Sequence, residues 1–107
     1  IEKYAKRNKQ QIQLVLLTVD YNNLWDDSES NKNEIISEIE NSIIYSLRGV
    51  DVCTKFSNSQ ILITLVDTSE ENVDLVMNRV LKNFYDSYEN RKIQIDYETQ
   101  NISIQAS

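Results

Sequence analysis

The residues of this chain that could take part in chemistry are few and of few types. The 107 residues include no histidine and a single cysteine, Cys53, which lies within an apolar run. These counts exclude a zinc site and a histidine-based catalytic arrangement. We interpret Cys53 as a structural thiol of a protein in a reducing compartment. Gly49 is the only glycine, so a glycine-rich loop that binds phosphate cannot form.

Carboxylates gather in one polar segment, which contains Asp20, Asp26, Asp27 and Glu29. Such a cluster could hold a metal ion. Its spacing fits no calcium-binding loop, however, and it lacks the glycine that such a loop needs at its turn. We therefore interpret the segment as a solvated acidic loop and expect no metal site.

A second candidate is a pair of opposite charges, Arg48 and Asp51, in the sequence Arg48-Gly49-Val50-Asp51. A guanidinium presents a planar fork of donors that matches phosphate and purine acceptors, and the carboxylate beside it can accept hydrogen bonds. The alternative interpretation is structural. An arginine in the last turn of a helix complements the helix dipole, and Asp51 could pair with Arg48 or end the helix.

A β-hairpin is predicted directly after this pair. The apolar runs at residues 50–56 and 60–66 flank a short polar break, Ser57-Asn58-Ser59. In both runs apolar residues alternate with polar or small ones, as in half-buried strands. In the run at residues 50–56, the alternating apolar positions include Val50, Val52 and Phe56. Asn58 tolerates a positive φ, which favours a tight turn there.

The chain before the hairpin is predicted to contain a strand and a helix. Residues 1–9 have the pattern of a helix end, and residues 12–20 form a near-continuous apolar run typical of a central strand buried on both faces. In the polar segment that follows, Leu24 and Trp25 are expected to anchor against the core. Asn33 can cap a helix over residues 34–48, whose apolar face includes Ile43 and Ile44.

After the hairpin, Thr68 and Glu71 are spaced as a capping box at the start of a second helix. Its apolar stripe is expected in the core and comprises Val73, Val76, Met77, Val80, Leu81 and Phe84. Alternating apolar residues from Ile93 onward predict one or two closing strands.

The element order is therefore strand, helix, strand, strand, helix, strand. This order predicts one α+β domain over residues 1–107, with a mixed, largely antiparallel central sheet and helices packed on it. The net charge of -6 argues against a nucleic-acid-binding surface. No apolar run approaches the roughly 20 residues that span a membrane. Because the chain starts without methionine in a helical pattern, we interpret it as excised from a longer protein.

The hairpin and the pair before it resemble the GGDEF domains of bacterial diguanylate cyclases. Five residues separate Asp51 from the turn, which is the spacing between the family's Arg-x-x-Asp site and its signature. The signature positions hold other residues here: Ser57, Asn58, Ser59, Gln60 and Ile61. The resemblance extends from Lys3 to about Ala106 and implies a palm-like, ferredoxin-like core that is truncated at both ends.

The resemblance also implies that the catalytic groups have been lost. The family's two metal carboxylates match Thr18 and Ser59, and its paired glycines match Ser57 and Asn58. Its lysine falls near Asn23, and its guanine-contacting asparagine matches Asp26. We therefore expect a degenerate domain with no catalytic residue, no bound metal and no cofactor, because two-metal phosphoryl transfer needs carboxylates to hold the ions.

The Arg-x-x-Asp site of this family is an inhibitory receptor for cyclic di-GMP. By resemblance Arg48 grips guanine or phosphate, Asp51 accepts from the guanine edge, and Arg79 on the next helix assists. The function expected is an inactive regulatory module of a cytoplasmic or membrane-anchored signalling protein, with cyclic di-GMP and other domains of that protein as partners. Two alternatives stay open. One is a structural relay or homodimerisation domain without a nucleotide, and the other is a weak nucleotide hydrolase or the regulatory domain of a phosphodiesterase.

Overall fold

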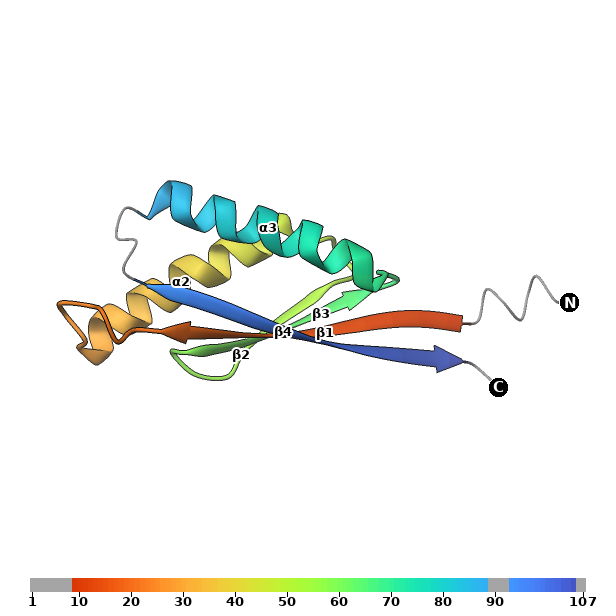
Figure 1. Ribbon diagram of the computed structural model, residues 1–107, viewed down its shortest axis with the longest axis horizontal. Helices are drawn as coiled ribbons and strands as arrows, with labels where there is room; N and C mark the ends of the chain where they lie inside the picture. Colours follow the sequence, from red (N-terminus) through yellow and green to blue (C-terminus); the bar gives the residue numbers. More distant parts are fainter. Residues whose placement is uncertain (1–8, 89–92, 106–107) are drawn as a thin grey trace, which may run out of the picture.

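Two helices cover one side of a four-stranded sheet in the computed structural model, which describes residues 9–88 and 93–105 (Figure 1). The sheet order is β2-β3-β1-β4, and the three pairings are antiparallel. The elements are β1 (Lys9–Asp20), α2 (Glu29–Ser46), β2 (Val52–Lys55), β3 (Gln60–Val66), α3 (Glu70–Ser87) and β4 (Gln94–Gln105). The α+β class and the predicted element order are confirmed. The helix end predicted at residues 1–9 lies outside the described residues, apart from Lys9, which begins β1.

Strand β1 is the centre of the sheet, paired with β3 on one side and β4 on the other. Val15, Leu17 and Val19 point toward the helices and are buried, whereas Leu14 and Leu16 point to the opposite face and are only partly buried. The prediction that this strand is buried on both faces is wrong. Both helices lie on the same side of the sheet (Figure 1), so the other face has no layer over it among the described residues.

Helix α2 begins five residues earlier than the predicted start. Ser28 is its N-cap, and the Ser28 side chain accepts a hydrogen bond from the backbone N–H of Asn31 at 3.2 Å. The predicted cap at Asn33 is therefore wrong. Ile43 is fully buried as predicted, but Ile44 is 56% exposed, because one further residue turns a helix by about 100° away from the core.

Helix α3 starts after Ser69, so the predicted capping box of Thr68 and Glu71 is also wrong. The Thr68 hydroxyl instead bonds Arg48 and the carbonyl of Val66. The apolar stripe of the helix is confirmed: Val73, Met77, Val80 and Phe84 are buried, and Val76 and Leu81 pack partly buried against them.

The hairpin is confirmed, but its first strand is shorter than predicted and has the opposite phase. In β2 it is Cys53 that packs against the core, whereas Val50, Val52 and Phe56 are more than half exposed. Burial, together with the negative charge of Glu40, raises the pKa of Cys53 to about 11, so the thiol stays protonated at neutral pH.

The remaining predictions concern the polar loop and the closing strand. Leu24 packs against the core as expected, but Trp25 is 91% exposed, so the prediction of a buried anchor at Trp25 is wrong. The closing segment is the single strand β4, preceded by the buried Ile93. In the part of the chain that the structure describes, neither helix has the length and apolar character needed to cross a membrane.

The neighbouring isoleucines of α2 provide a stability test. Replacing Ile43 with alanine should lower the free energy of unfolding by about 2–5 kcal/mol, because it empties a fully buried site. Ile44→Ala removes the same atoms from an exposed position, and its effect should stay within about 0.5 kcal/mol. Urea unfolding followed by circular dichroism measures both. Equal losses from the two variants would show that the buried face of α2 is misassigned.

Candidate functional site

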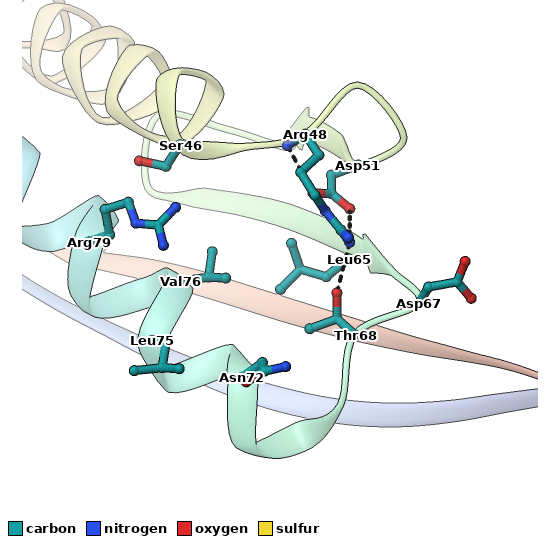
Figure 2. A pocket seen from close by; sticks show the side chains of 10 residues that line it. All are labelled: Ser46, Arg48, Asp51, Leu65, Asp67, Thr68, Asn72, Leu75, Val76 and Arg79. Atoms are coloured by element: carbon teal, nitrogen blue, oxygen red, sulfur yellow. Dashed lines mark hydrogen bonds and ion pairs between the residues drawn. The ribbon is translucent and has the colours of Figure 1, made fainter.

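A cavity of about 310 Å³ lies where the end of α2, the end of β3 and the first half of α3 meet (Figure 2). The three residues singled out from the sequence, Arg48, Asp51 and Arg79, all line it. The other residues that line the cavity are Ser46, Leu65, Asp67, Thr68, Asn72, Leu75 and Val76. The fold thus places Arg79 of α3 on the same cavity as the Arg-x-x-Asp pair that follows α2.

Asp51 is the most enclosed charged group of the site, with a side chain only 4% exposed. One carboxylate oxygen accepts from the backbone N–H of Arg48 at 3.0 Å and from Arg48 Nε at 3.3 Å. The other accepts from the backbone N–H of Val66 at 3.1 Å and from Arg48 Nη2 at 3.3 Å. A carboxylate has about four acceptor positions, so these bonds occupy the acceptor capacity of Asp51.

The protonation of Asp51 follows from these contacts. Partial burial by itself would raise the pKa of the carboxyl group, but the hydrogen bonds from Arg48 and Val66 favour the charged form. Their combined effect, with the positive charge of Arg48, holds the pKa of Asp51 below its usual range. Asp51 is therefore ionised at neutral pH and holds the Arg48 guanidinium in a two-pronged ion pair.

Arg48 follows the C-cap residue of α2, Leu47, and reaches across to the end of β3. Besides Asp51, its Nη2 donates to the hydroxyl of Thr68 at 3.0 Å and to the carbonyl of Val66. The side chain is still 55% exposed, so its outer edge faces the solvent and the cavity. The Thr68 contact could not be predicted from the sequence, because the spacing of Thr68 from Glu71 indicated a helix cap.

Arg79 reaches the cavity from the other side. It lies on the exposed surface of α3, and Figure 2 shows its guanidinium extending from the helix toward the cavity. Asn72 and Val76 line the same cavity from preceding turns of α3, as the helical spacing requires. Asp67 lines the rim in a left-handed conformation with φ of 53°, which aspartate tolerates better than most residues.

The hairpin turn, where the sequence predicted the positions of the signature, is bound to the start of α2. Asn58 Nδ2 donates to a Glu29 carboxylate oxygen at 2.7 Å, and the Tyr21 hydroxyl donates to the Asn58 carbonyl. Burial, and to a lesser degree Tyr88, raises the pKa of Tyr21 to about 12, so this hydroxyl remains a donor. Within the signature, Ile61 belongs to the buried core.

Thr18 and Ser59, which the sequence comparison predicted to replace metal-binding carboxylates, lie close together at this end of the sheet. Thr18 pairs with Gln60, and the neighbouring Val19 donates its N–H to the carbonyl of Ser59 at 2.8 Å. In the acidic loop, Asp20 and Asp26 make local contacts with the backbone. Asp26 accepts from the backbone N–H of Ser28, whose hydrogen bonds lower the pKa of Asp26. No group of three or more potential metal ligands is present in residues 9–88 and 93–105.

Solved structures provide the comparisons, since neither a protein-family model nor a curated protein matches the sequence. The chain is similar to the active GGEEF domain of a diguanylate cyclase from Vibrio cholerae, with 15% identity and a TM-score of 0.70 over 94% of this chain. It is also similar to the GGDEF domain of DgcB from Caulobacter crescentus in complex with c-di-GMP, with 10% identity and a TM-score of 0.69 over 94% of this chain. A DGC protein from Thermotoga maritima matches at 14% identity and a TM-score of 0.61 over 95% of this chain.

These alignments span part of each solved protein: 68% of the Vibrio chain, 64% of the Caulobacter chain and 70% of the Thermotoga chain. Identities of this size show a common fold and do not by themselves transfer an activity. The sheet order, the two helices on one side and the position of the hairpin are therefore those of a GGDEF domain, and the chain has the GGDEF fold.

Proposed function

We propose that this domain is a regulatory module that binds cyclic di-GMP in the cavity between α2 and α3 and does not synthesise it. The observation that carries the proposal is the convergence of Arg48, Asp51 and Arg79 on one cavity. The Caulobacter domain of the same fold, solved in complex with c-di-GMP, supports the choice of ligand. The lone thiol of Cys53 supports a cytoplasmic location for the module.

The geometry divides the roles within this site. Because its acceptor positions are occupied, Asp51 acts by positioning Arg48, and we do not assign it a contact with guanine. The outer edge of Arg48 and the guanidinium of Arg79 are then the two forks that bind phosphate or the acceptors of guanine. A cavity of about 310 Å³ is at the small end of ligand pockets, which hold about 300–1,000 Å³. It suits one guanine with its phosphate, with the rest of the ligand on the surface.

The proposed lack of cyclase activity rests on the residues at the sheet end. Thr18 and Ser59 are hydroxyls where the two metal carboxylates of the family would be, and hydroxyls do not supply the charge that magnesium ions need beside a triphosphate. Asn58 of the turn is also engaged in hydrogen bonds with the Glu29 carboxylate and the Tyr21 hydroxyl. The set of residues present does not fit a two-metal site.

One observation favours a second function, a structural relay that binds no nucleotide. The pair of Arg48 and Asp51 joins the turn after α2 to the end of β3 and to Thr68 before α3. These bonds join parts of the chain itself, so the pair has a structural role in either case. The two functions differ at Arg79, which has a role only if the domain binds the nucleotide.

The ligand proposal is tested by calorimetric titration with cyclic di-GMP at physiological salt. Arg79→Ala should weaken binding roughly tenfold or more, because charge-assisted hydrogen bonds contribute about 1.5–3 kcal/mol and 1.4 kcal/mol is a factor of ten. Arg48→Ala should weaken it by at least as much. Lys82→Ala removes the same charge from an exposed position of α3 outside the cavity and should leave binding unchanged.

Two results would contradict the ligand proposal. The first is the absence of heat and of chemical-shift changes for the wild-type domain at ligand concentrations near a millimolar, which would leave the relay function. The second is equal binding by the wild type and the two arginine variants, which would place the ligand elsewhere.

Incubation with GTP and magnesium or manganese should yield no cyclic di-GMP. Thr18→Asp combined with Ser59→Asp should not restore synthesis, because Ser57 and Asn58 still occupy the positions of the paired glycines. Chromatography measures the cyclic di-GMP formed, with an active cyclase as the positive control. Product above the level of an enzyme-free reaction would overturn this part of the proposal.

The structural role of Asp51 is tested through stability and pH. Asp51→Asn should lower the free energy of unfolding at pH 7 by about 1–3 kcal/mol, since it removes charge-assisted acceptors from an enclosed site. The pKa of Asp51 is lowered in the folded state, so its stabilising effect is complete above the ordinary pKa of 3.8 and is lost as the pH falls through the folded-state value. The difference between wild type and variant should therefore shrink in acid.

Asp67→Asn is the matched control for this experiment. It makes the same chemical change at an exposed position of the same cavity, and asparagine also tolerates the left-handed backbone there. Its effect on the free energy of unfolding at pH 7 should stay within about 0.5 kcal/mol. A loss from Asp51→Asn no larger than that from Asp67→Asn would show that the Asp51 bonds do not stabilise the fold.

A further inference from the structure

The sheet surface opposite α2 and α3, the open sheet face, is a feature that the proposed nucleotide site does not explain (Figure 1). Leu14 and Leu16 of β1 point to this face, since they alternate with residues that are buried under the helices. The strand register places Leu62 of β3 beside Leu16, and Val52 of β2 beside Thr64 in the row that contains Leu14.

These side chains form an apolar band, which consists of Leu14, Leu16, Val52, Phe56 and Leu62. Val52 is 53% exposed and Phe56 is 59% exposed, while the three leucines are partly buried. Four of the five, all but Val52, line a groove of about 500 Å³ that is completed by Glu98, Thr99 and Gln100. A contiguous apolar surface rimmed by polar residues is typical of an interaction site.

The dimensions of the apolar band match one α-helix. It covers β2, β3 and β1, and at about 4.8 Å between neighbouring strands these three span about 10 Å, the diameter of a helix with its side chains. Along the strands it runs from Val52 to Phe56, about 13 Å at 3.3 Å per residue, or roughly nine residues of helix. The sheet already packs helices α2 and α3 in this manner on its other face.

The charge of the open sheet face has one sign. Glu98 pairs with Leu16, Asp96 pairs with Thr18, and Asp20 follows on β1, so three carboxylates border the apolar band along β4 and the end of β1. Among the strand residues whose side chains are described, none that points to this face is basic. A partner that neutralises this rim must carry its own positive charges.

We propose that the open sheet face is a docking surface for an amphipathic helix of another protein. The apolar stripe of that helix covers the apolar band, and lysine or arginine residues along one flank meet Glu98 and Asp96. A second copy of this chain is the poorer occupant, because its own open sheet face brings no basic residue to the acidic rim. The surface lies across the sheet from the cavity of Arg48 and Arg79, so the proposal is independent of the nucleotide site.

The test uses the 107-residue domain labelled with ¹⁵N and two synthetic helical peptides. Both peptides carry the same leucine stripe, and one has lysine on its flanking positions where the other has glutamate. The lysine peptide should shift the backbone amide signals of β1, β3 and β4 around the apolar band, whereas the glutamate peptide should not. Glu98→Gln should weaken binding of the lysine peptide severalfold, and the weakening should diminish as salt is raised.

Variants on the surface identify the site. Leu16→Gln should weaken binding of the lysine peptide at least tenfold, and Ile44→Gln is the matched control, since it makes a similar change at an exposed residue of α2. If Leu16→Gln does not fold, as judged by circular dichroism, Val52→Thr and Phe56→Ser replace it. Both change residues that are more than half exposed, and the pair together should weaken binding at least tenfold.

Three outcomes would overturn the proposal. Equal shifts from the lysine and glutamate peptides would show that the acidic rim does not recognise the charge of the partner. Shifts confined to the signals of the helices would show that the peptide binds elsewhere on the domain. Signals that change with protein concentration alone, together with a dimer in sedimentation that Val52→Thr with Phe56→Ser abolishes, would identify a second copy as the occupant. Because no nucleotide is present, a failure here leaves the cyclic di-GMP proposal unaffected.

Discussion

The burial of one face of β1 under two helices is the constraint on which the rest of this structure depends. Val15 and Leu17 lie beneath α2 and α3, and the strand pairs on both edges, so the order of the sheet and the side of the helices are fixed together. Burial of such side chains is the main favourable term in folding. With both helices on one side, their ends meet at a single junction, and within residues 9–88 and 93–105 no element covers the opposite face of the sheet.

That junction is where the charged groups of the domain are organised. Asp51 accepts four hydrogen bonds at the point where the chain leaves α2, and it thereby fixes Arg48 against the end of β3. An enclosed carboxylate is favourable only when its acceptors are satisfied in this way. The same bonds that stabilise the turn also hold one guanidinium at the cavity, so the structural role and the proposed binding role share one set of atoms.

The candidate site illustrates how much a short motif can predict. The resemblance to the GGDEF family assigned Arg48, Asp51 and Arg79 to one site, and all three line one cavity of the folded domain. The resemblance could not predict that Asp51 would be saturated or that Thr68 would bond Arg48, since both depend on the distance between α2 and the end of β3. Only the packed structure sets that distance.

The sequence by itself determined the element order, the α3 stripe and the second hairpin strand, because helical and strand periods are local properties of the chain. The tertiary structure decided which face of each strand is covered. A continuous apolar run such as residues 12–20 looks the same whether helices lie on one side or on both, and the alternation over residues 50–56 did not show that Cys53, rather than Val52, faces the core. Alternation shows that two faces differ, but only the packing of distant elements determines which face is buried.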